Sequence, residues 1–166
     1  MAKLSNNQIT RIGVISDTHG TADPRICKIF QGVDLIIHAG DIGPGVLTEL
    51  ETIAPVSAVQ GNMDRFVCDR PLHEIEIIEI AQKKLLVTHI YGFPRRITKE
   101  LQELTAKLSP DVIIFGHSHY ATNEIADGKL YLNPGSAGSP RFALKRSLAI
   151  LTISSHDIHA EIIHLD

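Results

Sequence analysis

The sequence has little cysteine and no long run of apolar residues, and both absences exclude classes of protein. Its 166 residues include two cysteines, Cys27 and Cys68. Two cysteines cannot form a disulfide framework or a four-thiolate zinc site. No apolar run approaches the roughly 18 residues that cross a bilayer. The sequence therefore argues against a disulfide-stapled secreted protein and against a membrane-embedded one.

Basic clusters and a leader segment are also missing. The formal net charge is −3 and no block of Lys or Arg interrupts the sequence, which argues against a protein that coats nucleic acid. We expect no nucleic-acid partner beyond nucleotide substrates. Residues 1–7 are mostly polar and lack the apolar core of a signal peptide. The expectation is a cytoplasmic protein without a membrane partner.

No repeat, low-complexity segment or linker divides the chain. A chain of this length is typical of one domain and can bury about two-thirds of its unfolded surface. We therefore predict a single domain over residues 1–166.

Apolar runs rich in Ile and Val alternate with turn signals and with helical spacing, which predicts βαβ units followed by antiparallel strands. Residues 74–80 alternate acid and isoleucine, which predicts a strand with one face in water and a turn at Gln82 and Lys83. The fold class predicted is α/β, with two packed sheets flanked by helices. Strands are expected over residues 9–16, 33–39, 56–60, 74–80, 84–88, 111–115, 147–153 and 158–165 and as a hairpin within 122–132, and helices over 23–31, 46–53 and 98–108.

Nine histidines are present, and several follow expected strands in short polar clusters at residues 16–20, 40–41, 61–64, 88–89 and 116–119. In open α/β sheets, functional sites form beyond the carboxyl ends of the strands. We expect the clusters to converge at one edge. Their mixed nitrogen and oxygen donors are typical of a divalent-cation site and not of a nucleophile–base triad. The candidate donors are Asp17, His19, Asp41, Asn62, His89, His117 and His119.

Each cluster has a simpler explanation when it is taken alone. Asp17 can cap a helix, Asp41 can end a strand, and the Gly61–Asn62 pair can form a turn. Paired histidines such as His117 and His119 are less easily explained without a metal. Taken together, the clusters favour a site for two divalent cations, in which one aspartate bridges ions about 3.5–4 Å apart and a shared water becomes hydroxide at neutral pH.

The motifs Asp-x-His, Gly-Asp, Gly-Asn-x-Asp, His and Gly-His-x-His occur in the order of the calcineurin-like metallophosphoesterase superfamily, which the sequence resembles. The short length and the Asn-Pro-Gly-Ser segment at 133–136 are similar to its small prokaryotic phosphodiesterase branch. The resemblance runs from about residue 12 to about residue 141. It implies a four-layer α-β-β-α sandwich of two mixed sheets flanked by helices.

The resemblance also implies the metal ligands and the reaction. Asp17, His19 and His119 would hold one ion, Asn62, His89 and His117 the other, and Asp41 would bridge them. The implied cofactors are two divalent ions, with Mn²⁺ preferred and Ni²⁺, Zn²⁺ or Fe as alternatives. The implied reaction is hydrolysis of a small phosphodiester by in-line attack of a metal-bridging hydroxide, with Asp41, Asn62 and His89 as catalytic residues.

Three alternatives stay open at this point. The first is a phosphomonoesterase, including a protein phosphatase. The second is a protein-interaction scaffold like the retromer subunit, which shares the fold but lacks parts of the ligand set; it is disfavoured because all seven ligand positions are filled in this sequence. A nuclease of the same superfamily is disfavoured, since the chain lacks a basic surface run and a second domain. The oligomeric state is also open, with a homodimer as one option.

Two positions depart from the family pattern. Met63 stands where the larger phosphatases carry a histidine and the small branch more often has cysteine, and methionine cannot donate a proton. General-acid assistance of that kind is typically worth about 10²–10⁴-fold, so poor leaving groups should react slowly. Ile90 stands directly after His89, where the family usually has glycine.

Further residues are expected to support the site. Asp64 is predicted to accept a hydrogen bond that orients a ligand histidine, or to cap a turn. His38 either contacts the ligands from behind or is merely packed. Arg141 is a candidate for binding a substrate phosphate. Residues 133–136 are predicted to form a structural turn beneath the site, and Cys27 to lie in the core.

Overall fold

The computed structural model describes residues 8–65, 70–141 and 143–166, so Cys68 lies outside the described residues. Three helices and ten strands are assigned within these ranges. In chain order they are β1 (Thr10–Ile15), α1 (Arg25–Ile29), β2 (Leu35–His38), α2 (Val46–Glu51), β3 (Val56–Ala58), β4 (Ile75–Ile80), β5 (Lys83–Thr88), α3 (Lys99–Leu108), β6 (Val112–Ile114), β7 (Thr122–Ala126), β8 (Lys129–Asn133), β9 (Ser147–Ile153) and β10 (Ile158–His164).

The strands form two five-stranded mixed sheets, in the orders β10-β9-β1-β2-β3 and β4-β5-β6-β8-β7. In the first sheet β1, β2 and β3 are parallel, whereas β9 and β10 run antiparallel to their neighbours. In the second, β5, β6 and β8 are parallel, and antiparallel strands β4 and β7 occupy the edges. The parallel strands of each sheet therefore end on one side, where the polar clusters follow them.

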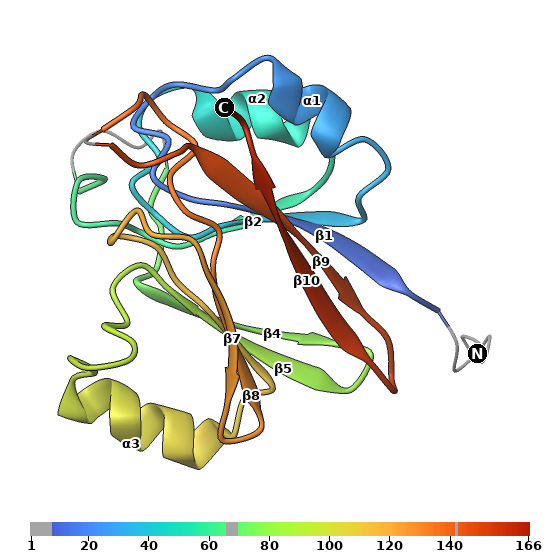
Figure 1. Ribbon diagram of the computed structural model, residues 1–166, viewed down its shortest axis with the longest axis vertical. Helices are drawn as coiled ribbons and strands as arrows, with labels where there is room; N and C mark the ends of the chain where they lie inside the picture. The colour runs from blue at the N-terminus through green and yellow to red at the C-terminus, as the bar shows by residue number, and fades with distance from the viewer. Residues whose placement is uncertain (1–7, 66–69, 142) are drawn as a thin grey trace.

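The main core fills the space between the two sheets. Side chains alternate between the faces of a strand, so Ile12 and Val14 of β1 point inward together with Leu85 and Val87 of β5. Burying such side chains stabilises the fold by roughly 1.5–3 kcal/mol each. Figure 1 shows the two sheets lying between α1 and α2 on one side and α3 on the other. The predicted four-layer α-β-β-α sandwich is confirmed.

The helices cover the outer sheet faces through a few apolar side chains. Ile26 and Phe30, one helical turn apart, pack α1 against the first sheet. Leu101 of α3 packs in one cluster with Leu86, Ile113 and Tyr131 of the second sheet. None of the helices within the described ranges has the length and hydrophobicity needed to cross a bilayer.

Cys27 was expected in the core, and that expectation is wrong, since its side chain is exposed. Ile26 and Phe30 already occupy the stripe of α1 that faces the sheet, and Cys27 lies about 100° around the helix from Ile26. The helix is also shorter than the expected 23–31.

The strand expected over residues 74–80 forms, but the face that it turns to water is not lined by acidic residues alone. Two consecutive isoleucines, Ile77 and Ile78, shift the pattern, so Ile75 and Ile77 share the more exposed face. The following turn lies at Ala81 and Gln82, one residue earlier than expected, because both adopt the left-handed backbone conformation and Ile80 pairs with Lys83.

Candidate metal centre

The loops that follow β1, β2, β3, β5 and β6 meet at one edge of the sandwich, as the strand-end clusters predict. The first two loops are joined by backbone hydrogen bonds, from Asp17 N to Gly40 O (3.0 Å) and from His19 N to Asp41 O (3.0 Å). A third connects the later clusters, from Gly116 N to His89 O (3.0 Å). A hydrogen bond from the His117 amide to Asp17 Oδ2 (3.1 Å) joins the loops of one sheet to those of the other.

The backbone of this unit is strained. Nine residues other than glycine have positive φ in the described part of the chain, and five of them are candidate donors. Such a conformation costs roughly 1–2 kcal/mol per residue and persists where the surroundings impose it. Clustered strain of this kind is a feature of functional sites. The five residues are Asp17, His19, Asp41, His117 and His119.

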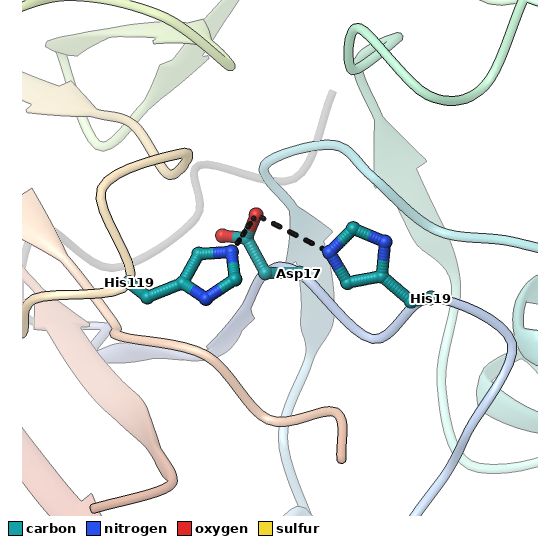
Figure 2. Close-up of side chains that lie close together, drawn as sticks. All are labelled: Asp17, His19 and His119. Atoms are coloured by element: carbon teal, nitrogen blue, oxygen red, sulfur yellow. Dashed lines mark ion pairs between the residues drawn. The ribbon is translucent and has the colours of Figure 1, made fainter. Parts of the chain in front are cut away.

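One group of donors comprises Asp17, His19 and His119 (Figure 2). Asp17 lies between the two imidazoles, with its Oδ1 3.2 Å from His119 Nε2 and 4.0 Å from His19 Nε2. Its other oxygen, Oδ2, accepts hydrogen bonds from the Ser16 hydroxyl (2.7 Å) and the His117 amide (3.1 Å). One carboxylate oxygen is therefore fixed by the protein and the other faces the histidines.

The second group comprises Asp41, His89 and His117, beside which lies Asn62, with its Oδ1 3.1 Å from His117 Nδ1. His89 Nε2 lies 3.3 Å from Asp41 Oδ2. His89 Nδ1 donates to the Ala39 carbonyl (2.7 Å). In the neutral ring this bond leaves the Nε2 lone pair directed into the site.

Asp41 connects the two groups. Besides its contact with His89, its Oδ2 lies 3.9 Å from His19 Nε2 of the first group. Its Oδ1 accepts a hydrogen bond from the Met63 amide at 2.8 Å. Asp41 is thus positioned with one oxygen anchored and the other between imidazoles of both groups, and Asp17 Oδ1 likewise lies 3.9 Å from His89 Nε2 of the second group.

The surroundings of the site shift the pKa values of three of its side chains, Asp41, His89 and His19. Burial alone would raise the pKa of Asp41, but the close contact with His89 and the hydrogen bond from the Met63 amide lower it overall. Burial would lower the pKa of His89, but its close contact with Asp41 and the charge of Asp17 raise it overall. Burial, assisted by Arg141, lowers the pKa of His19. Metal binding requires neutral imidazoles, so it would release a proton wherever His89 carries one.

Three buried side-chain atoms that could coordinate a metal have no hydrogen-bond partner: Asp17 Oδ1, His19 Nε2 and His89 Nε2. A buried polar atom without a partner costs about 1–3 kcal/mol. All three belong to the two groups described above, and cations bound by those groups would satisfy them. The residues present therefore fit divalent metal ions with nitrogen and oxygen ligands.

Asp64 supports the site differently from the expectation that it orients a histidine. Its Oδ1 accepts from the Ile42 and Gly43 amides (2.7 and 3.2 Å), and its Oδ2 accepts from the Gly61 amide (2.8 Å). All three donors are backbone groups, so the predicted contact with a ligand histidine is wrong, whereas the alternative prediction, that Asp64 caps a turn, agrees with its bond to the Gly61 amide. Asp64 instead ties the loop of Asp41 to the loop of Asn62.

His38 lies behind the site and is fully buried. The Thr18 hydroxyl donates to the Ile42 carbonyl (2.7 Å), so His38 Nε2–H donates to Thr18 Oγ1 (2.9 Å) and its Nδ1 accepts from the Gly40 amide (3.2 Å). Burial lowers the pKa of His38 to about 3, which keeps the ring neutral. The contribution of Thr18 was not anticipated, although it lies within the first polar cluster.

Residues 133–136 support the site as the predicted structural turn. Asn133 Nδ2 donates to the Gly116 carbonyl (3.0 Å), and the Ser136 hydroxyl donates to the Asp17 carbonyl (3.1 Å). Arg141 is exposed and lines a cleft of about 510 Å³ above His19 and His119. Tyr120 lines the same cleft and was not anticipated.

Known proteins resemble this chain in sequence and in fold. The family model for the calcineurin-like phosphoesterase superfamily domain matches residues 10–156. A probable metallophosphoesterase of Methanothermobacter thermautotrophicus is 40% identical over 159 residues, covering 92% of this chain and 91% of that protein.

Solved structures share the fold. One described as a novel archaeal phosphodiesterase is 27% identical with a TM-score of 0.74, covering 94% of this chain and all of that one. Zinc-bound Vps29 from Entamoeba histolytica is 23% identical with a TM-score of 0.71, covering 95% of this chain and all of that one. Because the identity to Vps29 is only 23%, this similarity concerns the fold alone. On the family match and the relative together, this chain belongs to the calcineurin-like phosphoesterase superfamily.

Proposed function

We propose that this protein is a phosphodiesterase that uses two divalent cations. The observation that carries the proposal is the convergence of seven donor side chains in two groups, with Asp41 between them and three buried donor atoms unpaired. A single ion would leave one group without a partner. The family match supports a phosphoester-hydrolysing reaction.

The proposed ligands follow the two groups. Asp17, His19 and His119 would hold one ion, Asn62, His89 and His117 the other, and Asp41 would be shared. When bound, two such ions supply Lewis-acid activation of a water and neutralise charge on the phosphoryl oxygens. The mixed donor set suits Mn²⁺, with Ni²⁺, Zn²⁺ and Fe as alternatives.

The chain's own residues would bind and orient the phosphate. Arg141 lines the cleft beside His19 and His119, and its planar guanidinium can hold two phosphate oxygens. Asn62 and His117 line the same cleft and offer polar contacts to the ester. The phosphate would thus be held between Arg141 and the donor groups.

Two features favour a diester over a monoester. Met63 occupies the position of the general-acid histidine, is 60% exposed and cannot protonate a poor leaving group. In addition, two cavities meet at Asn62 and Met63, which line both. A diester carries two alcohol substituents, and cavities on both sides give each a place, whereas a monoester needs one.

The test compares a diester with its matched monoester, bis(4-nitrophenyl) phosphate with 4-nitrophenyl phosphate, in the presence of Mn²⁺, Ni²⁺, Zn²⁺ or Mg²⁺. The proposal predicts faster diester hydrolysis with at least one transition metal. Faster monoester hydrolysis with every metal would establish a phosphomonoesterase instead. Absence of both bound metal and activity would favour a partner-binding scaffold.

A further inference from the structure

A groove of about 1000 Å³ lies beside the candidate metal centre, on the side away from Arg141. Asn62 and His89, two of the proposed ligands, form part of its wall. The rest of the wall is largely aliphatic. Its apolar side chains are Met63, Ile75, Ile90, Leu101 and Leu104.

The groove exposes apolar surface that the fold alone does not require. Met63 is 60% exposed, Ile90 46% and Ile75 36%. They come from three segments of the chain (the loop after β3, strand β4 and the loop after β5) and meet around one cavity. Contiguous apolar surface rimmed by polar groups marks a ligand-binding groove more often than scattered single residues do.

The sequence points to the same surface independently. Met63 and Ile90 are the two positions at which the chain departs from the family's motifs, and both departures place a large apolar side chain in this groove. Neither residue has a role in holding the proposed metals. Their shared location gives both departures one explanation, namely the shape and polarity of the groove.

The chemistry of the wall selects among substituents. None of the described lining residues carries a benzene or indole ring on which a nucleobase could stack. Glu74 and Glu100 also line the groove, and Arg65 is the one cation among the described lining residues. A second phosphate would meet two carboxylates there. The wall therefore favours an uncharged aliphatic chain.

We propose that this groove binds an extended alkyl substituent of the phosphodiester, while the phosphate lies at the metal centre and the other substituent extends toward Arg141 and Tyr120. The inference rests on the proposed phosphodiesterase function for its reaction. The binding of the alkyl chain itself depends on the groove alone. A volume of about 1000 Å³ is at the upper end of typical ligand pockets, so it accommodates a chain of several methylenes.

The kinetic test uses 4-nitrophenyl esters of methyl, butyl and hexyl phosphate with the best metal from the substrate comparison. Each fully buried methylene strengthens binding up to about fourfold. Since the groove is open to solvent, kcat/KM should rise at least about tenfold from the methyl to the hexyl ester. Ile75→Gln and Leu104→Gln should each reduce the hexyl-to-methyl ratio severalfold. Ile125→Gln is the matched control, because Ile125 is 77% exposed on β7 and does not line the groove.

A binding measurement separates this inference from the reaction. The sequence has two methionines, Met1 and Met63, so ¹³C-methyl labelling of methionine gives two signals that Met63→Leu assigns. Hexyl methyl phosphate should shift the Met63 signal saturably, in the metal-free and in the Zn²⁺-loaded protein. Dimethyl phosphate should shift it much less at equal concentration, and Ile75→Gln should weaken the hexyl response.

The outcomes are distinct. A Met63 response and kcat/KM that do not depend on chain length would overturn the inference, as would an Ile75→Gln variant that responds like the unmodified protein. A nucleoside substituent that is preferred over hexyl would overturn the alkyl assignment. Failure to hydrolyse even the methyl ester with any metal would refute the proposed function, while the methionine signal still reports whether the groove binds alkyl chains.

Discussion

Gly61 leaves no space for a side chain beside Asp41, which makes Gly61→Ala a direct test of the site's geometry. A Cβ at Gly61 would lie 2.1 Å from Asp41 N and 2.2 Å from Asp41 Oδ1. Non-bonded heavy atoms pack about 3.5 Å apart, so the two loops must separate by more than about 1 Å. The φ of Gly61 is not positive, and the effect of the methyl group is therefore contact alone.

The expected loss follows from how little displacement a metal site tolerates. Ligand distances are fixed to about 0.2 Å, and disturbing groups that orient ligands typically costs about 10–100-fold in metal affinity. Gly61→Ala should lower metal affinity by about 100-fold and, as an overpacked variant, lower the free energy of unfolding by about 1–3 kcal/mol. Calorimetric titration of the metal-free protein measures the affinity, and urea unfolding measures the stability.

Gly128→Ala is the matched control. Gly128 has φ +71° in the turn between β7 and β8, and a Cβ there meets nothing within 4 Å. This variant should lose about 1 kcal/mol of stability through backbone strain and keep its metal affinity. If Gly61→Ala bound both ions as tightly as the unmodified protein, the position assigned to Asp41 would be wrong.

Three further substitutions test other parts of the account. Asp64→Asn removes one acceptor from the carboxylate that holds three backbone amides, and it should lower stability by about 2 kcal/mol and weaken metal binding about tenfold; unchanged urea unfolding would contradict this. The hydrogen bond from Arg25 holds the pKa of Asp23 below its usual range, with Arg146 adding to it, so the stability it contributes should be complete above about pH 5 and decline as the pH falls below the unfolded-state value of about 3.9. Asp23→Asn should therefore lower stability at pH 7 and differ less from the unmodified protein at pH 3, and a constant difference across that range would refute the assignment. Met63→His supplies a proton donor at an exposed position and should raise monoester hydrolysis up to about 10²-fold while leaving activated diesters little changed, as parallel kinetics would show.

The strand pattern and the polar clusters that follow the strands were sufficient to predict an α/β sandwich with its donors at one edge, whereas the four-layer arrangement and the division of the donors between two ions were implied by the family resemblance. Each cluster follows a buried strand, and parallel strands end on one side of a sheet, which accounts for the loops of Asp17 and Asp41 being neighbours and for His89 lying near His117. The Ile- and Val-rich runs that locate the strands also fill the core between the sheets. Local patterns and the tertiary arrangement agree here.

What the sequence did not reveal depends on contacts between loops. Asp64 was expected to meet a histidine, but the return of its loop places three backbone amides around it instead. Ile75 exposes its side chain because strand β4 lies at a sheet edge beside a groove. The groove itself joins segments from β4, α3 and two loops, and no local pattern reports such a cavity.

The proposed reaction depends on Asp41 being shared by two divalent ions. The most direct measurement is the number of Mn²⁺ ions bound per chain at equilibrium, together with diester hydrolysis, for the unmodified protein and for Asp41→Ala. We expect two ions and activity in the unmodified protein, and at most one ion and no hydrolysis in the variant. Two ions retained in an active Asp41→Ala variant would contradict it.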